Sequence, residues 1–276
     1  MSKSAKKQVD DCKEHGQEEL DLSERNITNI MDVPGLLGLR HLTKLTLSHN
    51  RIVVVPPSIA ELQGLESLNL FNNHIEEIPI NLSTLPNLKI LNLAVNRLNG
   101  LPRGFGAFPK LEILDLMYNN LNENSLPGNF FLIETLRALY LGDNDFETIP
   151  AEIGHLQKLQ ILVLRDNDLI SLPKEIGGLE RLKELHIQGN RLTVIPPELG
   201  KLDLVGERRV FKGDNNPWAA PIADQFQAGI SHVFDYIRSD TYKYLYGRHT
   251  QAAAAAPPKT SDKSKKISRK ANSARK

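Results

Sequence analysis

Apolar residues recur along this chain in a fixed frame around an asparagine. In every copy, the positions eight, five and three before the asparagine and two after it are apolar. The copies follow one another at steps of 23, 23, 23, 25, 23 and 23 residues. The asparagines are Asn50, Asn73, Asn96, Asn119, Asn144, Asn167 and Asn190.

This frame is that of the leucine-rich repeat, whose period lies in the low twenties. Each repeat can bury its apolar residues only against its neighbours, so the pattern predicts a solenoid. Alternating side chains of a short strand point to opposite faces, so the leucines of one strand share the buried face. The expected fold class is therefore an α/β solenoid, a leucine-rich repeat horseshoe with a parallel concave sheet and a helical C-terminal cap.

The recurring asparagine and a later proline have separate structural roles in this frame. An asparagine amide both donates and accepts hydrogen bonds, so it can satisfy backbone groups where the chain leaves the strand. A proline follows six residues after most of the asparagines and fixes φ on the return segment. These prolines are Pro56, Pro79, Pro102, Pro150, Pro173 and Pro196. The convex side is expected to consist of turns and short helical pieces.

Both ends of the pattern are irregular, as is the repeat that starts at Asn119. There the proline, Pro127, lies eight residues after the asparagine, which predicts a bulge at 122–125. Residues 20–27 match the frame with Arg25 in the asparagine position, which predicts a degenerate N-terminal repeat. We expect a polar N-terminal cap segment at 1–19. The solenoid, about eight repeats plus a degenerate closure, is expected at 20–218.

The chain changes character after the last full repeat. Pro221 is expected to open a helix, and an apolar stripe along 222–237 predicts an amphipathic cap for the exposed end of the core. A capping region at 219–249 then precedes a tail, residues 250–276, with eight positive charges and one negative. That composition predicts disorder. A basic tail could also be a nuclear localisation signal, a nucleic-acid contact or a weak lipid contact.

Composition narrows the classes of function. Charged residues make up 24% of the chain, the formal net charge is +1, and no apolar run approaches the length of a membrane span. Without the tail the net charge is about −6, so nucleic-acid binding by the folded part is unexpected. The first twenty residues lack a secretory signal, and a single cysteine, Cys12, favours a reducing, cytoplasmic location.

Motifs for catalysis or for a cofactor are missing from the sequence. We find no phosphate-binding loop, zinc-protease motif, paired-cysteine motif or nucleophile elbow. The eight histidines are scattered, and His49 and His186 are expected at opposite ends of the sheet. We therefore expect no enzyme, no cofactor and no metal site, and a monomeric chain that works through a surface.

The concave face of the sheet is the expected binding surface, because apolar and aromatic side chains gather there beside charged ones. Aromatic residues, Met and Arg with a polar rim are typical of protein-binding hot spots. Asp115, Tyr140 and Arg165 are expected on three successive strands. The predicted partner-binding residues are Phe71, Ile90, Asn92, Ile113, Asp115, Met117, Tyr118, Tyr140, Asp143, Ile161, Val163, Arg165 and His186.

Several segments resemble the Ras suppressor family of animals. They are residues 101–106, 122–131, 136–141, 169–177, 182–192, 242–249 and 262–270. The resemblance covers nearly the whole chain and includes the irregular repeat and the C-terminus. It departs most in the first twenty residues and in the alanine run Ala252 to Ala256.

The resemblance implies a cytoplasmic adaptor of integrin adhesions that binds a LIM domain of PINCH. Through PINCH it implies a link to integrin-linked kinase and parvin, and it implies a restraint on Ras-dependent signalling. Two alternatives remain: a scaffold that binds a small GTPase or phosphatase directly, and a nuclear or nucleic-acid role of the basic tail. Zinc in such a complex would belong to the LIM domain.

Overall fold

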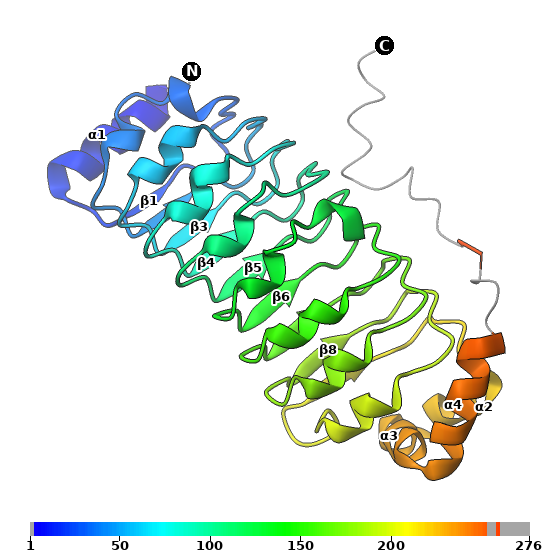
Figure 1. Ribbon diagram of the computed structural model, residues 1–276. Coiled ribbons are helices and arrows are strands. Elements are labelled where there is room, and N and C mark those ends of the chain that lie inside the picture. Colours follow the sequence, from blue (N-terminus) through cyan, green and yellow to red (C-terminus); the bar gives the residue numbers. More distant parts are fainter. Residues whose placement is uncertain (1–2, 253–257, 260–276) are drawn as a thin grey trace. The chain divides into compact units, whose positions relative to one another are not determined.

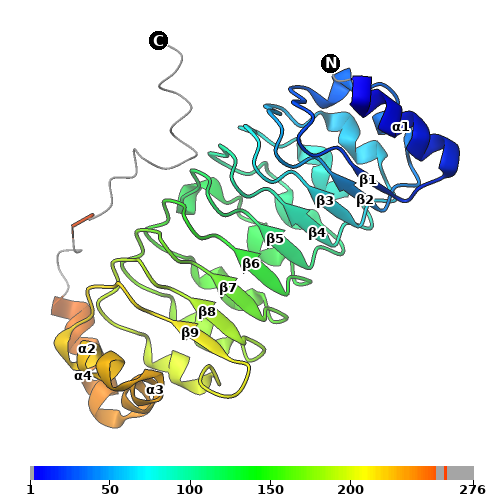
Figure 2. The same ribbon diagram turned by 180° about the vertical axis from the view of Figure 1, so that it is seen from behind.

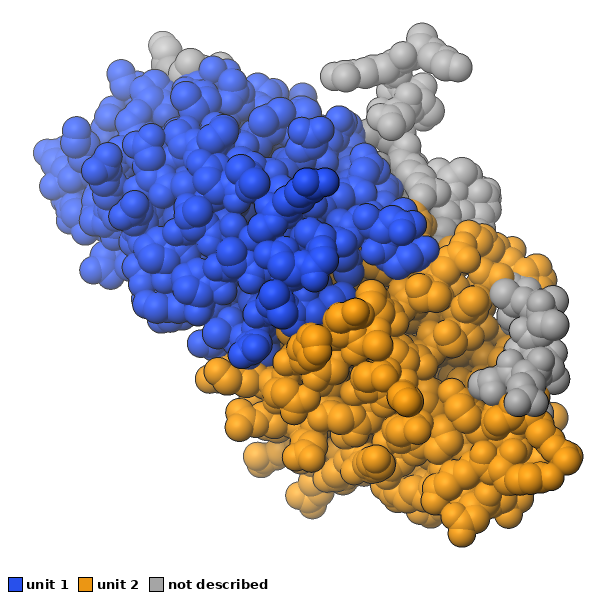
Figure 3. Space-filling model, viewed as in Figure 1, with its two compact units in different colours: residues 1–136, 264–276 blue, residues 137–263 orange. Residues whose placement is uncertain are grey.

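The computed structural model describes residues 3–252 and 258–259 (Figure 1). The predicted tail at 250–276 therefore falls mostly outside the described residues. The chain forms two compact units, which among these residues comprise 3–136 (unit 1) and 137–252 with 258–259 (unit 2) (Figure 3). Each unit is a stack of leucine-rich repeats and is described by itself.

The fold is a leucine-rich repeat solenoid with nine parallel strands and C-terminal helices, as the frame predicts. Each strand has three residues, and its middle residue is buried. Figure 2 shows the strands from behind. Unit 1 contains β1 (Glu19–Asp21), β2 (Lys44–Thr46), β3 (Ser67–Asn69), β4 (Ile90–Asn92) and β5 (Ile113–Asp115). Unit 2 contains β6 (Ala138–Tyr140), β7 (Ile161–Val163), β8 (Glu184–His186) and β9 (Val210–Lys212).

Strand register follows the repeat frame residue for residue. Leu45 pairs with Leu68 and Leu68 with Leu91 in unit 1, and Leu162 pairs with Leu185 in unit 2. Equivalent leucines are thus stacked along the buried face, where contact with the neighbouring repeats excludes water. We call the opposite side of the sheet the open face. It is formed by the first and third residues of each strand and by the residues between the strand and the next asparagine.

The seven recurring asparagines are all buried. Asn96 shows the pattern in unit 1. Its Nδ2 donates to the carbonyls of Leu70 and Leu93, both at 3.0 Å, and its Oδ1 accepts from the N–H of Ile75 at 3.0 Å. Bonds to backbone groups of the same repeat and of the preceding one are likewise made by Asn50, Asn73, Asn119, Asn167 and Asn190. An ionised aspartate could only accept hydrogen bonds, so it could not replace them.

The residue just before each asparagine adopts a left-handed conformation. His49, Asn72, Val95, Tyr118, Asp143, Asp166 and Gly189 have φ between 53° and 69°. The same holds for Glu24 before Arg25, in the degenerate first repeat. Asparagine, aspartate and glycine tolerate this region well, whereas a β-branched residue such as Val95 does so only with strain. This turn brings residues such as Tyr118 and Asp143 to the edge of the open face.

The return segments are short 3₁₀ helices. A proline precedes the five-residue helices η3, η4, η8, η9 and η10. The segments are η1 (Ile30–Asp32), η2 (Leu36–Gly38), η3 (Pro57–Glu61), η4 (Ile80–Thr84), η5 (Phe105–Ala107), η6 (Glu123–Ser125), η7 (Phe130–Leu132), η8 (Ala151–His155), η9 (Lys174–Gly178) and η10 (Pro197–Lys201). The predicted bulge after Asn119 is η6, where Ser125 Oγ donates to the carbonyl of Asn99 at 2.7 Å.

The N-terminal segment is a helix, α1 (Lys3–His15). Its residues Ala5, Val9 and Cys12 are buried, and Arg25 Nε donates to Gln8 Oε1 at 3.1 Å. The sequence predicted a polar cap segment here without a helix, although the apolar residues of the segment recur at helical spacing. The helix covers the first repeat, so Cys12 lies in a core and not in an exposed polar stretch.

The C-terminal cap consists of three helices: α2 (Ala220–Ala228), α3 (Ile230–Arg238) and α4 (Asp240–Ala252). The apolar stripe predicted along 222–237 is divided at Gly229, whose φ of 129° ends α2. Val233, Phe234 and Ile237 of α3 are fully buried. Phe211 of β9 meets Phe234 edge to face at 5.1 Å, which joins the last strand to the cap.

Candidate protein-binding surface

The open face of unit 1 is shaped by three short turns, one at the end of each of three strands. Asn69, Asn92 and Asp115, at the ends of three consecutive strands, each accept a hydrogen bond from the N–H two residues later, at 2.9 to 3.0 Å. These bonds hold Phe71 and Met117 at the surface. Asn92 and Asp115 therefore have two roles: they fix these turns, and they are themselves partly exposed on the open face.

Apolar and aromatic groups lie between these turns in unit 1. Phe71 contacts the His49 ring edge to face, with centroids 5.2 Å apart, and His49 Nδ1 is 2.8 Å from Asn72 Nδ2. Ile90 is 40% exposed, and Ile113, Met117 and Tyr118 are half-buried. Unit 1 thus carries seven of the predicted partner-binding residues on one face of its sheet: Phe71, Ile90, Asn92, Ile113, Asp115, Met117 and Tyr118.

In unit 2 the open face is organised by Arg165. Its Nη1 lies 2.8 Å from Asp143 Oδ2 and 2.6 Å from Asp166 Oδ2. Both acids occupy the left-handed position before an asparagine, so equivalent turns of two neighbouring repeats hold the guanidinium. Arg165 is 25% exposed, so it is ordered yet accessible to a partner.

Tyr140, Val163 and His186 lie side by side on the open face of unit 2, at matching positions of β6, β7 and β8. Tyr140 and His186 are half-buried, whereas Val163 is only 6% exposed. Val163, one of the predicted partner-binding residues, is therefore nearly covered, and a larger side chain lies on each neighbouring strand. Ile161, at the start of β7, is half-buried.

The surroundings of His186 favour the neutral form of its imidazole. Burial lowers the pKa of its imidazole, and the neighbouring positive charge of Lys212 lowers that pKa further. Glu184 Oε2, 3.6 Å from His186 Nε2, opposes this shift only in part. The surface of unit 2 therefore presents an aromatic hydroxyl, an uncharged imidazole and a guanidinium held by acids.

One residue that the sequence analysis missed is Asn216, which extends the asparagine series by one repeat. Its Nδ2 donates to the carbonyls of Ile187 and Gly213 at 2.9 and 3.0 Å, and its Oδ1 accepts from Leu192 N–H at 3.2 Å. The frame around it is broken, since Arg208 and Gly213 stand where leucines are expected. Asn215, directly before Asn216, still adopts the left-handed conformation found before the other asparagines, with φ of 55°.

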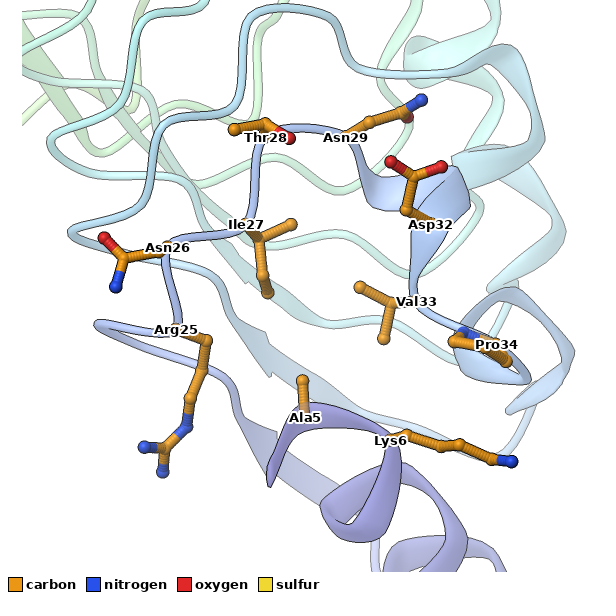
Figure 4. Close-up of a pocket in the computed structure, with 10 residues that line it drawn as sticks. All are labelled: Ala5, Lys6, Arg25, Asn26, Ile27, Thr28, Asn29, Asp32, Val33 and Pro34. Atoms are coloured by element: carbon orange, nitrogen blue, oxygen red, sulfur yellow. The ribbon is translucent and has the colours of Figure 1, made fainter. Parts of the chain in front are cut away.

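Within the described part of the chain, no group of three or more His, Cys, Asp or Glu side chains is placed to hold a metal ion. Burial raises the pKa of the Cys12 thiol, which disfavours the reactive thiolate. A cavity of about 130 Å³ lies between α1 and residues 25–34 (Figure 4). It is smaller than the usual small-molecule sites of 300 to 1,000 Å³.

Family models match most of the repeats. The leucine rich repeat model matches residues 18–75, 40–85 and 63–121, and a leucine-rich repeat region model matches residues 106–216. Over 270 residues the chain is 73% identical to Ras suppressor protein 1 of Homo sapiens and 74% identical to that of Bos taurus, with 98% of each chain covered. The chain belongs to the Ras suppressor protein 1 family.

Membership of the Ras suppressor protein 1 family makes this chain a non-enzymatic, protein-binding leucine-rich repeat protein. Among solved structures, it is similar to a leucine-rich repeat protein of Leptospira interrogans. The TM-score is 0.65 at 31% identity, over 72% of this chain and 55% of that one. Within the described residues no helix has the length and apolar character needed to cross a membrane.

Proposed function

We propose that this chain is an adaptor at cell–matrix adhesions that binds a LIM domain of PINCH through the open-face residues of its two units. PINCH would link it to integrin-linked kinase and parvin. The chain would restrain Ras-dependent signalling from a cytoplasmic position enriched at focal adhesions, with a possible nuclear fraction through its basic tail.

Family membership supports the proposal first. Mammalian relatives named Ras suppressor protein 1 align with 98% of this chain, so the similarity includes the irregular repeat and the C-terminal helices as well as the repeat frame. An unrelated leucine-rich repeat protein would resemble this chain only at the apolar and asparagine positions of the repeat frame. The resemblance to that family is what directs attention to PINCH and to Ras signalling.

The chemistry of the open face in unit 2 is the observation that carries the proposal. Tyr140 is paired with Val163 on the neighbouring strand, and Arg165 lies between two acids at 2.8 and 2.6 Å. Tyrosine and arginine are the residue types most often found at energetic hot spots. Because the acids already order Arg165, a partner would lose little side-chain entropy when it contacts the guanidinium.

The open face of unit 1 adds apolar area. Ile90 is 40% exposed on a strand, and the half-buried Phe71 and Met117 are each fixed by a turn. Methionine adapts its shape to a partner, and phenylalanine supplies a rigid apolar surface. A compact zinc module could pack against such groups, and its zinc would be bound by the module's own residues.

Calorimetry of the full chain with purified PINCH LIM domains tests the proposal. Tyr140→Ala is expected to cost about 2 kcal/mol or more of binding if the ring is an anchor. Asp115→Ala and Arg165→Ala test the polar contacts of the two units separately. Glu152→Ala, an exposed change on η8, is the control and should bind normally. Circular dichroism on each variant checks folding.

Two results would contradict the proposal. A folded triple variant, Asp115→Ala, Tyr140→Ala and Arg165→Ala, that binds the LIM domains like the parent would exclude the open face. Binding of purified Ras to the parent, without binding of any LIM domain, would favour the direct GTPase-binding alternative.

A further inference from the structure

Lys259, the first basic residue of the tail, contacts two acids of unit 2. Residues 258–259 are the short red segment beyond α4 in Figure 1. The Lys259 Nζ lies 2.5 Å from Glu147 Oε1 and 4.0 Å from Asp168 Oδ2. The hydrogen bond to Glu147 raises the pKa of the Lys259 amine, and both carboxylates raise it further by their charge.

The two acids belong to neighbouring repeats of unit 2. Glu147 lies three residues after Asn144, and Asp168 lies one residue after Asn167. The Asp168 side chain is only 3% exposed, whereas that of Glu147 is 41% exposed. A carboxylate as buried as Asp168 is stabilised by nearby positive charge.

Part of that positive charge comes from the solenoid itself. Arg191, at the position after Asn190 that is equivalent to Asp168, is 8% exposed and lies close enough to lower the pKa of Lys259. Lys259 adds a second positive charge, and its amine lies within 4.0 Å of both carboxylates.

The position of Lys259 in the chain makes the contact favourable. Helix α4 ends at Ala252, so six residues, 253–258, connect the cap to Lys259. A tether of this length keeps the amine close to the acids, so docking proceeds at a high effective concentration. The sequence continues with Lys263, Lys265, Lys266, Arg269 and Lys270, against one acid, Asp262.

We propose that Glu147 and Asp168 form a docking site for this chain's own basic C-terminal segment, with Lys259 as the side chain that enters it. The site is distinct from the open face, although it is close to it in sequence. Asp166, which pairs with Arg165, lies two residues before Asp168 on the same turn. Docked Lys259 thus brings a positive charge next to the turn that orders Arg165.

Limited trypsin digestion of the full chain, followed by mass spectrometry, tests the contact directly. Trypsin must take the Lys259 side chain into its own acidic pocket, so only the undocked segment is cleaved after Lys259. Glu147→Gln is expected to raise the rate of this cleavage several-fold at low salt. The rate after Lys263 should change much less, which serves as an internal reference.

Salt and a matched variant complete the digestion experiment. At about 1 M salt, where screening is nearly complete at a few ångströms, the parent should be cleaved as fast as the variant. Glu152→Gln, an exposed acid on η8 of the same unit, is the control and should behave like the parent. Equal rates after Lys259 in the parent and in Glu147→Gln at low salt would overturn the proposal.

A spin label identifies the occupant of the site. Ser261→Cys can be labelled selectively, because the native Cys12 is buried. The label should broaden the amide signals of Glu147 and Asp168, and Lys259→Gln should abolish this effect. Broadening that persists in Lys259→Gln would overturn the role of Lys259. Broadening of an unlabelled isotope-enriched chain by a separate labelled chain would show docking between copies and overturn the intramolecular contact.

Discussion

The Tyr242 hydroxyl group makes two hydrogen bonds to the backbone of Ile195. It donates to the Ile195 carbonyl at 2.6 Å and accepts from the Ile195 N–H at 3.0 Å. Tyr242 belongs to α4 and is 1% exposed, whereas Ile195 precedes η10 in the last full repeat. One side chain thus satisfies both backbone groups of a solenoid residue and fixes the C-terminal helices to unit 2.

Tyr242→Phe should destabilise the fold by about 1–3 kcal/mol, because it leaves two buried backbone groups without a partner. The ring contacts with Tyr236 and Tyr246 would be retained. Urea unfolding followed by circular dichroism measures the effect. Tyr244→Phe is the matched control, since Tyr244 is 64% exposed, and it should stay within about 0.5 kcal/mol of the parent.

The same tyrosine predicts a loss of stability at alkaline pH. Burial raises the pKa of Tyr242 above its ordinary value of 10.0. Above about pH 10 the unfolded chain releases this proton while the folded chain keeps it, so the stability falls as the pH rises toward the folded pKa. Tyr242→Phe should show a shallower decline, with a remainder from Tyr246, whose pKa burial also raises. Parallel curves for the two proteins would contradict this assignment.

Asn119→Ala tests the asparagine series at the irregular repeat. The buried amide accepts from Leu98 N–H and donates to the carbonyls of Leu93, Leu116 and Met117, at 3.0 to 3.1 Å. We expect a loss of about 1–3 kcal/mol through unpaired backbone groups. Asn92→Ala removes the single bond to Ala94 N–H at a half-buried site and should cost less. Equal unfolding midpoints for the two variants would be inconsistent with this view.

Val95 is a β-branched residue in the left-handed region, with φ of 57°. Glycine and asparagine adopt this conformation more readily, and the equivalent residues include Asn72 and Gly189. Val95→Asn should therefore stabilise the chain by about 1 kcal/mol, within the range of the left-handed penalty. Val53→Asn, an exposed valine without positive φ, is the control. A lower melting temperature for Val95→Asn than for the parent would show that its packing outweighs the strain.

The sequence predicted the repeats well because their burial follows a strict period. Every recurring asparagine lies in the core, and strands β1 to β8 each have the predicted leucine at the centre, whereas β9 has Phe211 there. The N-terminal helix was missed, and Asn216 was expected only as part of a degenerate closure. Both lie at an end of the solenoid, where one side of the core has no further repeat to pack against. The residues there need not follow the apolar pattern of the repeat.

The surface was predictable only in part. The alternation of strand residues placed Tyr140 and Arg165 on the open face. It could not show that Tyr140 and His186 shield Val163, since that depends on the sizes of neighbours some 23 residues away in the chain. The contact of Lys259 with Glu147 joins residues more than one hundred positions apart, and no local pattern predicts such a pair.

Arg165→Gln should weaken partner binding more than it destabilises the fold. The ion pairs of Arg165 with Asp143 and Asp166 are partly exposed, so their loss should cost the fold about 1 kcal/mol or less. If the guanidinium contacts a LIM domain, the affinity should nevertheless fall about tenfold, which corresponds to about 1.4 kcal/mol. Asp143→Asn keeps Arg165 but removes one of the acids that order it, so it should weaken binding less. Calorimetry with urea unfolding on both variants checks this, and a fall in stability without a fall in affinity would make Arg165 a structural residue only.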